Sequence, residues 1–391
     1  MVGRPAAIAL ALGSLCAACL LPHTTESPPR QRACPTMTDG VGAPLTWYAP
    51  DSTTDSKTAE AWCLATGPAV IDSVPGGRFG SWRAGDSLRV VAWNVAGGGG
   101  DLLRLLDQEL GLDCDAAEPA LAPRGPHFVL LLQEAYRRSA AVPADPPESA
   151  IARAVVEQER PGPRVDVVQV AQRCGLALAY VPAARNGPRE YDGEREDKGN
   201  AILSTLPLSD VIAVEMPMVG QRRVEVAATL RDARGDSVRV VSVHLSNFPP
   251  PYAVLRSGGS SRLRQALTLV DALSRVEIER SGRASDTAFV ACHPDCSSDG
   301  SAVHPIATLV AGDLNTWSGG STALKHLYEH FPDSPPYDPT PTRTGFRPDH
   351  VLFRRATTGA AGTILEGSYR RFDSAFHSDH HPIAVWFRFD S

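Results

Sequence analysis

The sequence predicts an α/β sandwich, in which two β-sheets pack face to face and helices cover their outer faces. Three observations lead to this prediction. Apolar runs of strand length recur through most of the chain, and stretches with helical spacing interrupt them only at intervals. Hydrophobic residues make up 43% of the 391 residues, which is enough for a large core. Gly and Pro number 33 each, so many turns must connect the elements.

The main domain is expected to begin near Ser87, where the first long apolar run starts. Residues 88–95 predict a buried strand, and the glycines at 97–100 predict the turn after it. Asp101 then stands where it can cap a helix that runs through Leu110. Further strands are expected at 128–132, 176–181, 200–204, 210–215, 222–230, 237–244, 306–311, 350–354, 366–372 and 382–389. Further helices are expected at 149–160, 262–280 and 321–330.

The first segment has the pattern of a signal peptide. Within residues 1–21, Arg4 precedes a short, Ala-rich apolar run. Cys19 follows a segment that resembles a bacterial lipoprotein processing site, so residues 1–18 could be removed and Cys19 lipidated as a membrane anchor. Without lipidation the product would be periplasmic or released. In either case we expect an exported protein, in the periplasm, on the outer membrane or outside the cell.

A linker and N-terminal extension is expected at 22–86, and the main domain at 87–391. Residues 22–45 are rich in Pro, Ser and Thr, which is typical of a tether. Residues 46–86 carry three tryptophans, so part of this stretch is expected to pack on the main domain. The chain is expected to work as a monomer.

Six cysteines follow Cys19, and an even number in an exported protein permits disulfides, although the sequence does not select their pairing. Cys292 and Cys296 could close a small loop. A zinc site at this pair is disfavoured, because no second pair of ligands lies near it at suitable spacing.

Polar residues stand at the ends of several predicted strands, where a rigid sheet edge can bring them together. Oxygen donors dominate among them and suit Mg²⁺ or Mn²⁺ better than zinc. Taken one at a time, each has a structural explanation, such as a turn former or a solvated strand end. These strand-end residues are Asn94, Glu134, His244, Asp313, Asn315, Asp349, Asp379 and His380.

Their order along the chain resembles the endonuclease/exonuclease/phosphatase superfamily, over roughly residues 87–390. The resemblance rests on Trp-Asn at 93–94, Gln-Glu at 133–134 and Gly-Asn-Ala-Ile-Leu-Ser at 199–204. It also rests on Val-His-Leu at 243–245, Gly-Asp-Leu-Asn at 312–315, Asp-His-Val-Leu at 349–352 and Ser-Asp-His-His-Pro at 378–382. It implies an α+β fold, a four-layer α/β/β/α sandwich with two mostly antiparallel sheets flanked by helices.

The resemblance also implies a role for each residue. Glu134 would be the principal metal ligand, with Asn94 and Asp379 contributing. Asp313 would deprotonate the attacking water, and Asn315 would bind that water or a phosphoryl oxygen. Asp349 would orient His380, which meets the phosphate as an imidazolium, and His244 would contact the phosphate or assist the leaving oxygen. Beyond these, Arg222 and Arg223 either bind substrate phosphates or alternate across a strand.

The expected activity is metal-dependent phosphodiester hydrolysis, with nucleic acid as the leading substrate. The formal charge of −6 weakens a nuclease interpretation without excluding it, because a local positive site can suffice. A phospholipid or sphingomyelin phosphodiesterase and a phosphomonoesterase remain alternatives. A binding protein on an inactive version of the fold is disfavoured, because such a protein is expected to lose catalytic residues that are all present here.

Overall fold

We describe a computed structural model of the chain, in which the residues described are 36–38, 45–48, 64–75, 79–83, 85–115, 126–143, 163–218, 222–247, 261–280, 306–316, 321–357 and 362–390. The residues expected to form a helix at 149–160 lie outside these ranges. So do Cys19, Cys292 and Cys296, the residues of the expected lipidation and of the small loop.

Two mixed sheets form the centre of the protein. The nine-stranded sheet, here sheet A, has the order β1-β3-β6-β7-β5-β4-β15-β13, with β14 paired to β15. Its strands are β1 (Thr36–Thr38), β3 (Ala69–Asp72), β4 (Leu88–Asn94), β5 (Phe128–Ser139), β6 (Ala177–Tyr191), β7 (Glu194–Ser204), β13 (Thr363–Ile364), β14 (Arg370–Arg371) and β15 (Ile383–Arg388).

The six-stranded sheet, here sheet B, has the order β12-β11-β10-β9-β8-β2. Its strands are β2 (Thr46–Tyr48), β8 (Ser209–Glu215), β9 (Val224–Arg231), β10 (Ser237–His244), β11 (Ala307–Asp313) and β12 (Asp349–Arg354). The described helices are α2 (Leu102–Leu110), α4 (Val167–Cys174), α6 (Ser261–Arg280) and α7 (Thr322–His330).

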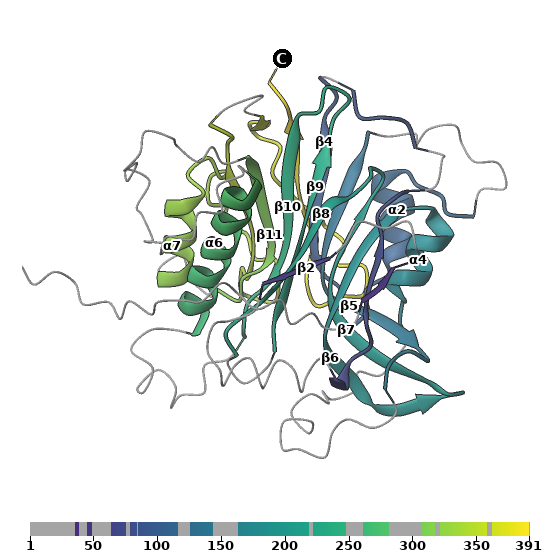
Figure 1. Cartoon of the computed structure of the whole chain (residues 1–391). Helices are drawn as coiled ribbons and strands as arrows, with labels where there is room; N and C mark the ends of the chain where they lie inside the picture. Colours follow the sequence, from purple (N-terminus) through teal and green to yellow (C-terminus); the bar gives the residue numbers. More distant parts are fainter. Residues whose placement is uncertain are drawn as a thin grey trace, which may run out of the picture.

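The elements form the four layers that the sequence predicted (Figure 1). One buried cluster fills the space between the two sheets and includes Val90, Leu131, Val240 and Leu309. A second cluster lies between sheet A and helices α2 and α4, and a third lies between sheet B and helices α6 and α7. Each sheet therefore buries both faces, which explains the continuous apolar runs of its central strands.

Local sequence explains how α2 begins and ends. The side chain of Asp101 accepts a hydrogen bond from the backbone N–H of Arg104, as expected of an N-cap residue. At the other end, Gly111 adopts a left-handed conformation with φ of 66°. Glycine reaches this region without steric cost, so the helix stops there.

The structure departs from the expected elements in four respects. The β6–β7 hairpin extends well beyond the predicted strands, and α4 was missed by the sequence analysis. The N-terminal extension adds β1 and β3 to sheet A and β2 to sheet B, with Trp47 and Trp82 buried. The strand expected at 366–372 is reduced to β14, because polar and glycine residues precede it.

Cys114 and Cys174 form a disulfide that the sequence could not single out. It joins the segment after α2 to the last residue of α4, so the two helices on the outer face of sheet A are linked covalently. Among the described residues, no helix is both long and apolar enough to cross a membrane.

Candidate active site

Strand register places three of the predicted residues side by side at one end of sheet B. His244 pairs with Asp313 across β10 and β11, and Asp313 pairs with Asp349 across β11 and β12. All three side chains are buried. Three neighbouring strands thus deliver an imidazole and two carboxylates to one edge, as the strand-end pattern predicted.

Sheet A contributes Asn94 and Glu134 through β4 and β5. On β5, Gln133 and Glu134 stand opposite the single residue Asn200 of β7, which makes a β-bulge. Glu134 has φ of 52°, a conformation that a non-glycine residue rarely adopts. The bulge lets Gln133 point inward to Ser242 of sheet B while the Glu134 carboxylate lines an open pocket. Such local strain is typical of functional sites.

The two sheets meet through Asn94, whose Nδ2 donates a hydrogen bond of 3.0 Å to Asp313 Oδ2. The other oxygen of Asp313 accepts from the backbone N–H of Asn315 at 2.9 Å. Asn315 has φ of 49° and donates through Nδ2 to the carbonyl of Leu245. Asp313 is therefore held in one orientation by a donor from each sheet.

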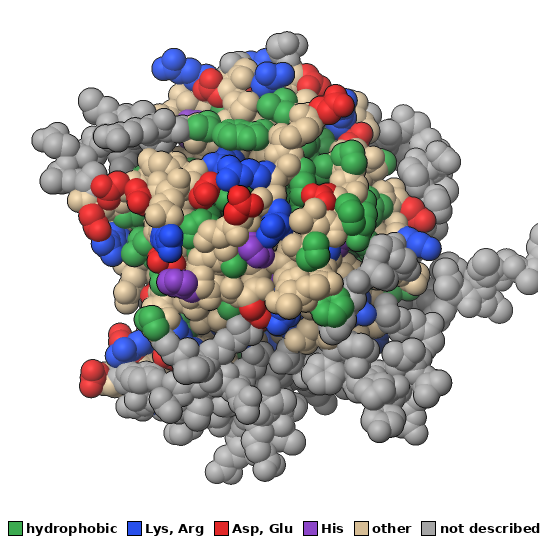
Figure 2. Space-filling view, turned by 180° about the vertical axis from the view of Figure 1, so that it is seen from behind, with side chains coloured by type: hydrophobic (Ala, Val, Ile, Leu, Met, Phe, Trp, Pro, Cys, Tyr) green, Lys and Arg blue, Asp and Glu red, His purple; other side chains and the backbone are tan. Residues whose placement is uncertain are grey.

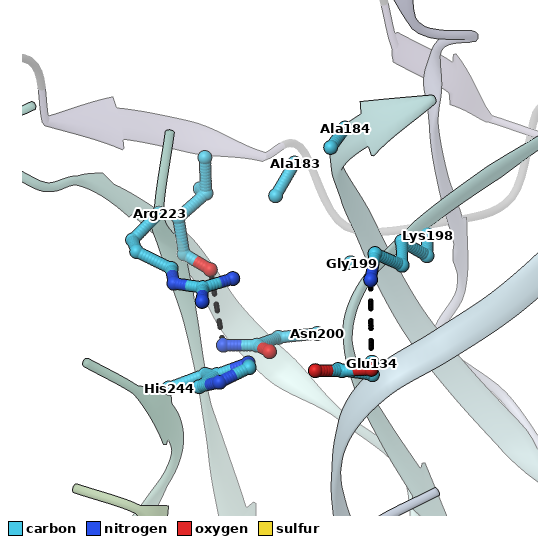
Figure 3. A pocket seen from close by; sticks show the side chains of 9 residues that line it. Glu134, Ala183, Ala184, Lys198, Gly199, Asn200, Arg223 and His244 are labelled. Carbon is cyan, nitrogen blue, oxygen red and sulfur yellow. Dashed lines mark hydrogen bonds and ion pairs between the residues drawn. The ribbon is translucent and has the colours of Figure 1, made fainter. Parts of the chain in front are cut away.

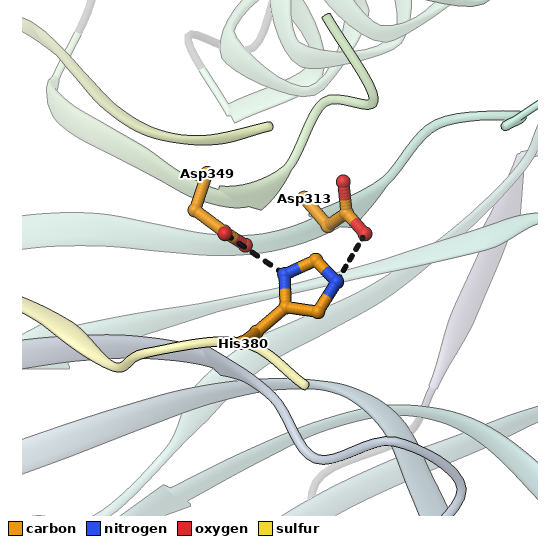
Figure 4. A group of neighbouring side chains, drawn as sticks. All are labelled: Asp313, Asp349 and His380. Atoms are coloured by element: carbon orange, nitrogen blue, oxygen red, sulfur yellow. Dashed lines mark hydrogen bonds and ion pairs between the residues drawn. The ribbon is translucent and has the colours of Figure 1, made fainter. Parts of the chain in front are cut away.

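His380 lies between two carboxylates (Figure 4). Its Nδ1 is 2.9 Å from Asp349 Oδ2, and its Nε2 is 3.8 Å from Asp313 Oδ2. Burial alone would lower the pKa of His380, but the charge and hydrogen bond of Asp349, with Asp313 and Asp379, raise it to about 9. The imidazole therefore carries a positive charge at neutral pH.

The carboxylate of Asp349 also accepts a hydrogen bond from Thr342, whose hydroxyl donates to Oδ2 at 2.6 Å. Thr342, which precedes β12, thus orients the Asp349 carboxylate, and Asp349 in turn orients His380. His380 is also held from its backbone, because Trp93 Nε1 donates to its carbonyl at 2.9 Å.

His244 has the opposite electrostatic character. Burial lowers its pKa, the charge of Arg223 lowers it further, and the opposing effects of Asp313 and Glu134 leave it at about 3. His244 is therefore neutral at pH 7. Its Nε2 lies 3.5 Å from Asp313 Oδ2. A neutral imidazole at this position can donate a hydrogen bond to a phosphate oxygen but supplies no charge.

Glu134 and Asn94 fit a hard divalent cation. Glu134 offers a carboxylate and Asn94 an amide oxygen, and Mg²⁺ and Mn²⁺ prefer such ligands. Glu134 Oε2 lies 3.5 Å from Lys198 Nζ, which is longer than the roughly 2.7–2.9 Å of a charge-assisted hydrogen bond. The carboxylate can therefore turn to a metal ion without losing a short bond to this lysine.

Asp313, Asp349 and His380 also lie close enough together to hold a cation, with one ligand atom from each within 4.8 Å of the others. The hydrogen bond from His380 to Asp349 and the raised pKa of His380 favour the imidazolium, which is not a metal ligand. This group therefore presents one positively charged imidazole and two carboxylates in place of a cation site.

The structure leaves Asp379 at the rim of the site and Arg222 outside it. Asp379 was predicted to add a metal ligand; its side chain is 37% exposed and pairs with Arg343 at 2.6 Å, and its charge also acts on His380. Arg222 was predicted to bind substrate, but it is buried and pairs with both oxygens of Glu215 at 2.6 and 2.7 Å. Arg223, by contrast, lines the pocket beside Glu134 and His244.

Sequence reasoning missed three residues around this pocket (Figure 3). Lys198 faces Glu134, and Asn200 donates to Glu225 Oε2 at 2.7 Å. Glu225 also accepts from the backbone N–H of His244, and burial raises its pKa to about 8. Lys198 directly precedes the Gly-Asn motif, so the motif could have pointed to it. Glu225 stands inside an apolar strand, and no motif in the sequence pointed to it.

The glycine of that motif is required by packing. A Cβ atom added to Gly199 would stand 1.9 Å from the carbonyl oxygen of Val181 on the neighbouring strand β6. Only glycine lets β6 and β7 approach this closely at the pocket, which places Lys198 and Asn200 beside the catalytic residues.

A model of the endonuclease/exonuclease/phosphatase family matches residues 91–380 of this chain. The match begins in β4 and ends at His380, so it spans every catalytic residue assigned above. No curated protein matches the chain.

Three solved structures illustrate the range of proteins with a similar fold. An endonuclease/exonuclease/phosphatase from Beutenbergia cavernae is 16% identical, with 78% of this chain and 72% of that chain covered and a TM-score of 0.43. Sphingomyelinase C from Streptomyces griseocarneus is 17% identical, with coverages of 77% and 99% and a TM-score of 0.39. A humanized D. rerio TDP2 is 16% identical, with coverages of 77% and 99% and a TM-score of 0.36.

Proposed function

This chain belongs to the endonuclease/exonuclease/phosphatase family, and we propose that it is an exported, Mg²⁺- or Mn²⁺-dependent phosphodiesterase that cleaves nucleic acid. Membership makes it a phosphoesterase, a hydrolase of phosphate ester bonds. The observation that carries the proposed mechanism is the buried Asp349–His380–Asp313 group, in which one imidazolium lies between two carboxylates.

In the proposed reaction, a water molecule attacks phosphorus and Asp313 accepts its proton. Asp313 suits this role because Asn94 and Asn315 fix both of its oxygens. As the new P–O bond forms and the bond to the leaving oxygen breaks, negative charge grows on the phosphoryl oxygens. The imidazolium of His380 stabilises that charge, and neutral His244 donates a hydrogen bond to an oxygen of the same group.

Glu134 and Asn94 would hold the metal ion, which when bound supplies positive charge to the phosphoryl group. The charge and hydrogen bond of Asp349 keep His380 protonated and oriented. The reaction requires no covalent intermediate with the protein.

The substrate is tested by a panel assay. The chain without residues 1–33 is incubated with Mg²⁺ and plasmid DNA, RNA, sphingomyelin, bis-p-nitrophenyl phosphate or the phosphomonoester p-nitrophenyl phosphate, beside the His380→Ala variant. We expect cleavage of DNA or RNA by the wild-type protein only. Cleavage of sphingomyelin alone would replace the nuclease proposal with a lipid phosphodiesterase, and activity on a phosphomonoester alone would replace it with a phosphatase.

The disulfide between Cys114 and Cys174 supports the export part of the proposal, because disulfides persist in oxidising compartments. We expect mass spectrometry of the protein from its native envelope or medium to show a chain that lacks the first segment. A start at Cys19 with a lipid mass would identify the membrane-anchored form. An intact Met1 together with free thiols at Cys114 and Cys174 would contradict export.

A further inference from the structure

The pocket that contains Glu134 and His244 is also lined by residues of β6, of β7 and of the segment that leads into β9, here called its extension. Two cationic side chains line this extension, Lys198 from β7 and Arg223 from the residue before β9. Figure 3 shows them on opposite sides, with Asn200, Glu134 and His244 below. Both side chains are at least nine-tenths buried, with 6% of each residue exposed.

The position of Arg223 separates it from the reacting phosphoryl group. Asp313 lies on β11 and Arg223 precedes β9, and β10 runs between these two strands. Neighbouring strands are about 4.8 Å apart, so the two positions are separated by roughly 10 Å across the sheet. Backbone positions this far apart let Arg223 meet a different group of the substrate from the phosphate held at Asp313 and His380.

The two cationic side chains of the extension favour an anionic group of the substrate there. Arginine binds phosphate with two parallel N–H donors, and lysine binds it as a compact charge. The charges of Arg223 and Lys198 both lower the pKa of His244, against the charges of Asp313 and Glu134, so both cations lie near this imidazole. On the face seen in Figure 2, basic and acidic side chains of the described residues are interspersed. Selection for an anion would thus come from this local pair.

We propose that Arg223 and Lys198 form a subsite for a second phosphate of the substrate, next to the phosphate that is hydrolysed. The inference rests on the proposed function and refines its substrate class. The favoured substrates are a nucleic acid strand, which supplies a neighbouring phosphate, and a small bisphosphate. A phosphocholine lipid is disfavoured, because its quaternary ammonium group would meet two cations.

The test measures inhibition of bis-p-nitrophenyl phosphate hydrolysis, since that substrate has one phosphate only. Thymidine 3′,5′-bisphosphate is expected to inhibit the wild-type protein about ten- to a hundredfold more tightly than thymidine 5′-monophosphate. Arg223→Gln and Lys198→Gln should each remove most of this ratio. Arg104→Gln, on the exposed face of α2, is the matched control and should keep it.

A short oligothymidylate distinguishes the two sources of the second phosphate. Tighter inhibition by the oligomer than by the bisphosphate assigns a nucleic acid strand, and equal inhibition assigns a small bisphosphate. Equal inhibition by the mono- and bisphosphate in the wild-type protein would overturn the subsite. A ratio that survives in both Gln variants, each shown by circular dichroism to be folded, would overturn it as well.

Calorimetric titration of the same nucleotides separates this inference from the proposed function. A protein that hydrolyses none of the panel substrates, yet binds the bisphosphate more tightly through Arg223 and Lys198, would contradict only the proposed function. A protein that hydrolyses bis-p-nitrophenyl phosphate but binds both nucleotides equally would contradict only the subsite.

Discussion

His380→Ala is expected to lower kcat/KM for phosphodiester hydrolysis by roughly 10²–10⁴-fold, with the fold retained. The imidazolium is buried between Asp349 and Asp313, so its charge acts on the phosphate with little screening by water. The change is measured by steady-state kinetics, with circular dichroism to verify folding. His381→Ala is the matched control, because His381 is the adjacent histidine and only contacts the carbonyl of Phe372 through Nδ1.

The pH profile tests the charge of His380 directly. Since its pKa is raised to about 9, the imidazolium persists at neutral pH, and kcat/KM should fall only as the pH rises through about 9. Asp349→Asn removes the charge that raises this pKa and leaves at most a weaker, neutral hydrogen bond, while burial continues to lower it. The falling limb should then move to lower pH by at least about one unit. An unchanged limb would contradict the assigned role of the Asp349–His380 pair.

Glu134→Gln is expected to weaken Mg²⁺ or Mn²⁺ binding by at least about tenfold and to lower activity at limiting metal by a larger factor. An amide keeps the shape of the side chain at the β-bulge but loses the negative charge that attracts the cation. Metal affinity is measured by calorimetry, which does not depend on turnover. Glu194→Gln on the neighbouring strand β7 is the control, since that carboxylate pairs with Arg138 near the surface.

Metal removal completes this test. EDTA should abolish activity of the wild-type protein, and Mg²⁺ or Mn²⁺ should restore it, because the ligand set consists of oxygen donors. Restoration by zinc alone would show that a different ligand set holds the metal. Wild-type metal affinity and activity in Glu134→Gln would remove Glu134 from the site.

Much of the catalytic group could be predicted from the sequence because each member directly follows or precedes an apolar strand. Asn94, His244, Asp313 and Asp349 are such residues; strand register placed the last three at neighbouring positions, and Asn94 reaches Asp313 through a hydrogen bond. The prediction failed for Arg222. Arg222 and Arg223 are adjacent, and the sequence does not show which of the two faces the site.

The sequence by itself determined the layers of the fold and the chemical types at the catalytic edge. The periods of apolar residues depend on local geometry, and the strand-end motifs are local as well. Only the tertiary structure decided how Lys198, Glu225 and Arg223 lie around Glu134 and His244. Their positions depend on a β-bulge, on the close approach of β6 to Gly199 and on contacts between strands far apart in the chain. Charges placed by such contacts set the pKa values of His244 and His380, because burial and neighbouring charges act through distance in space.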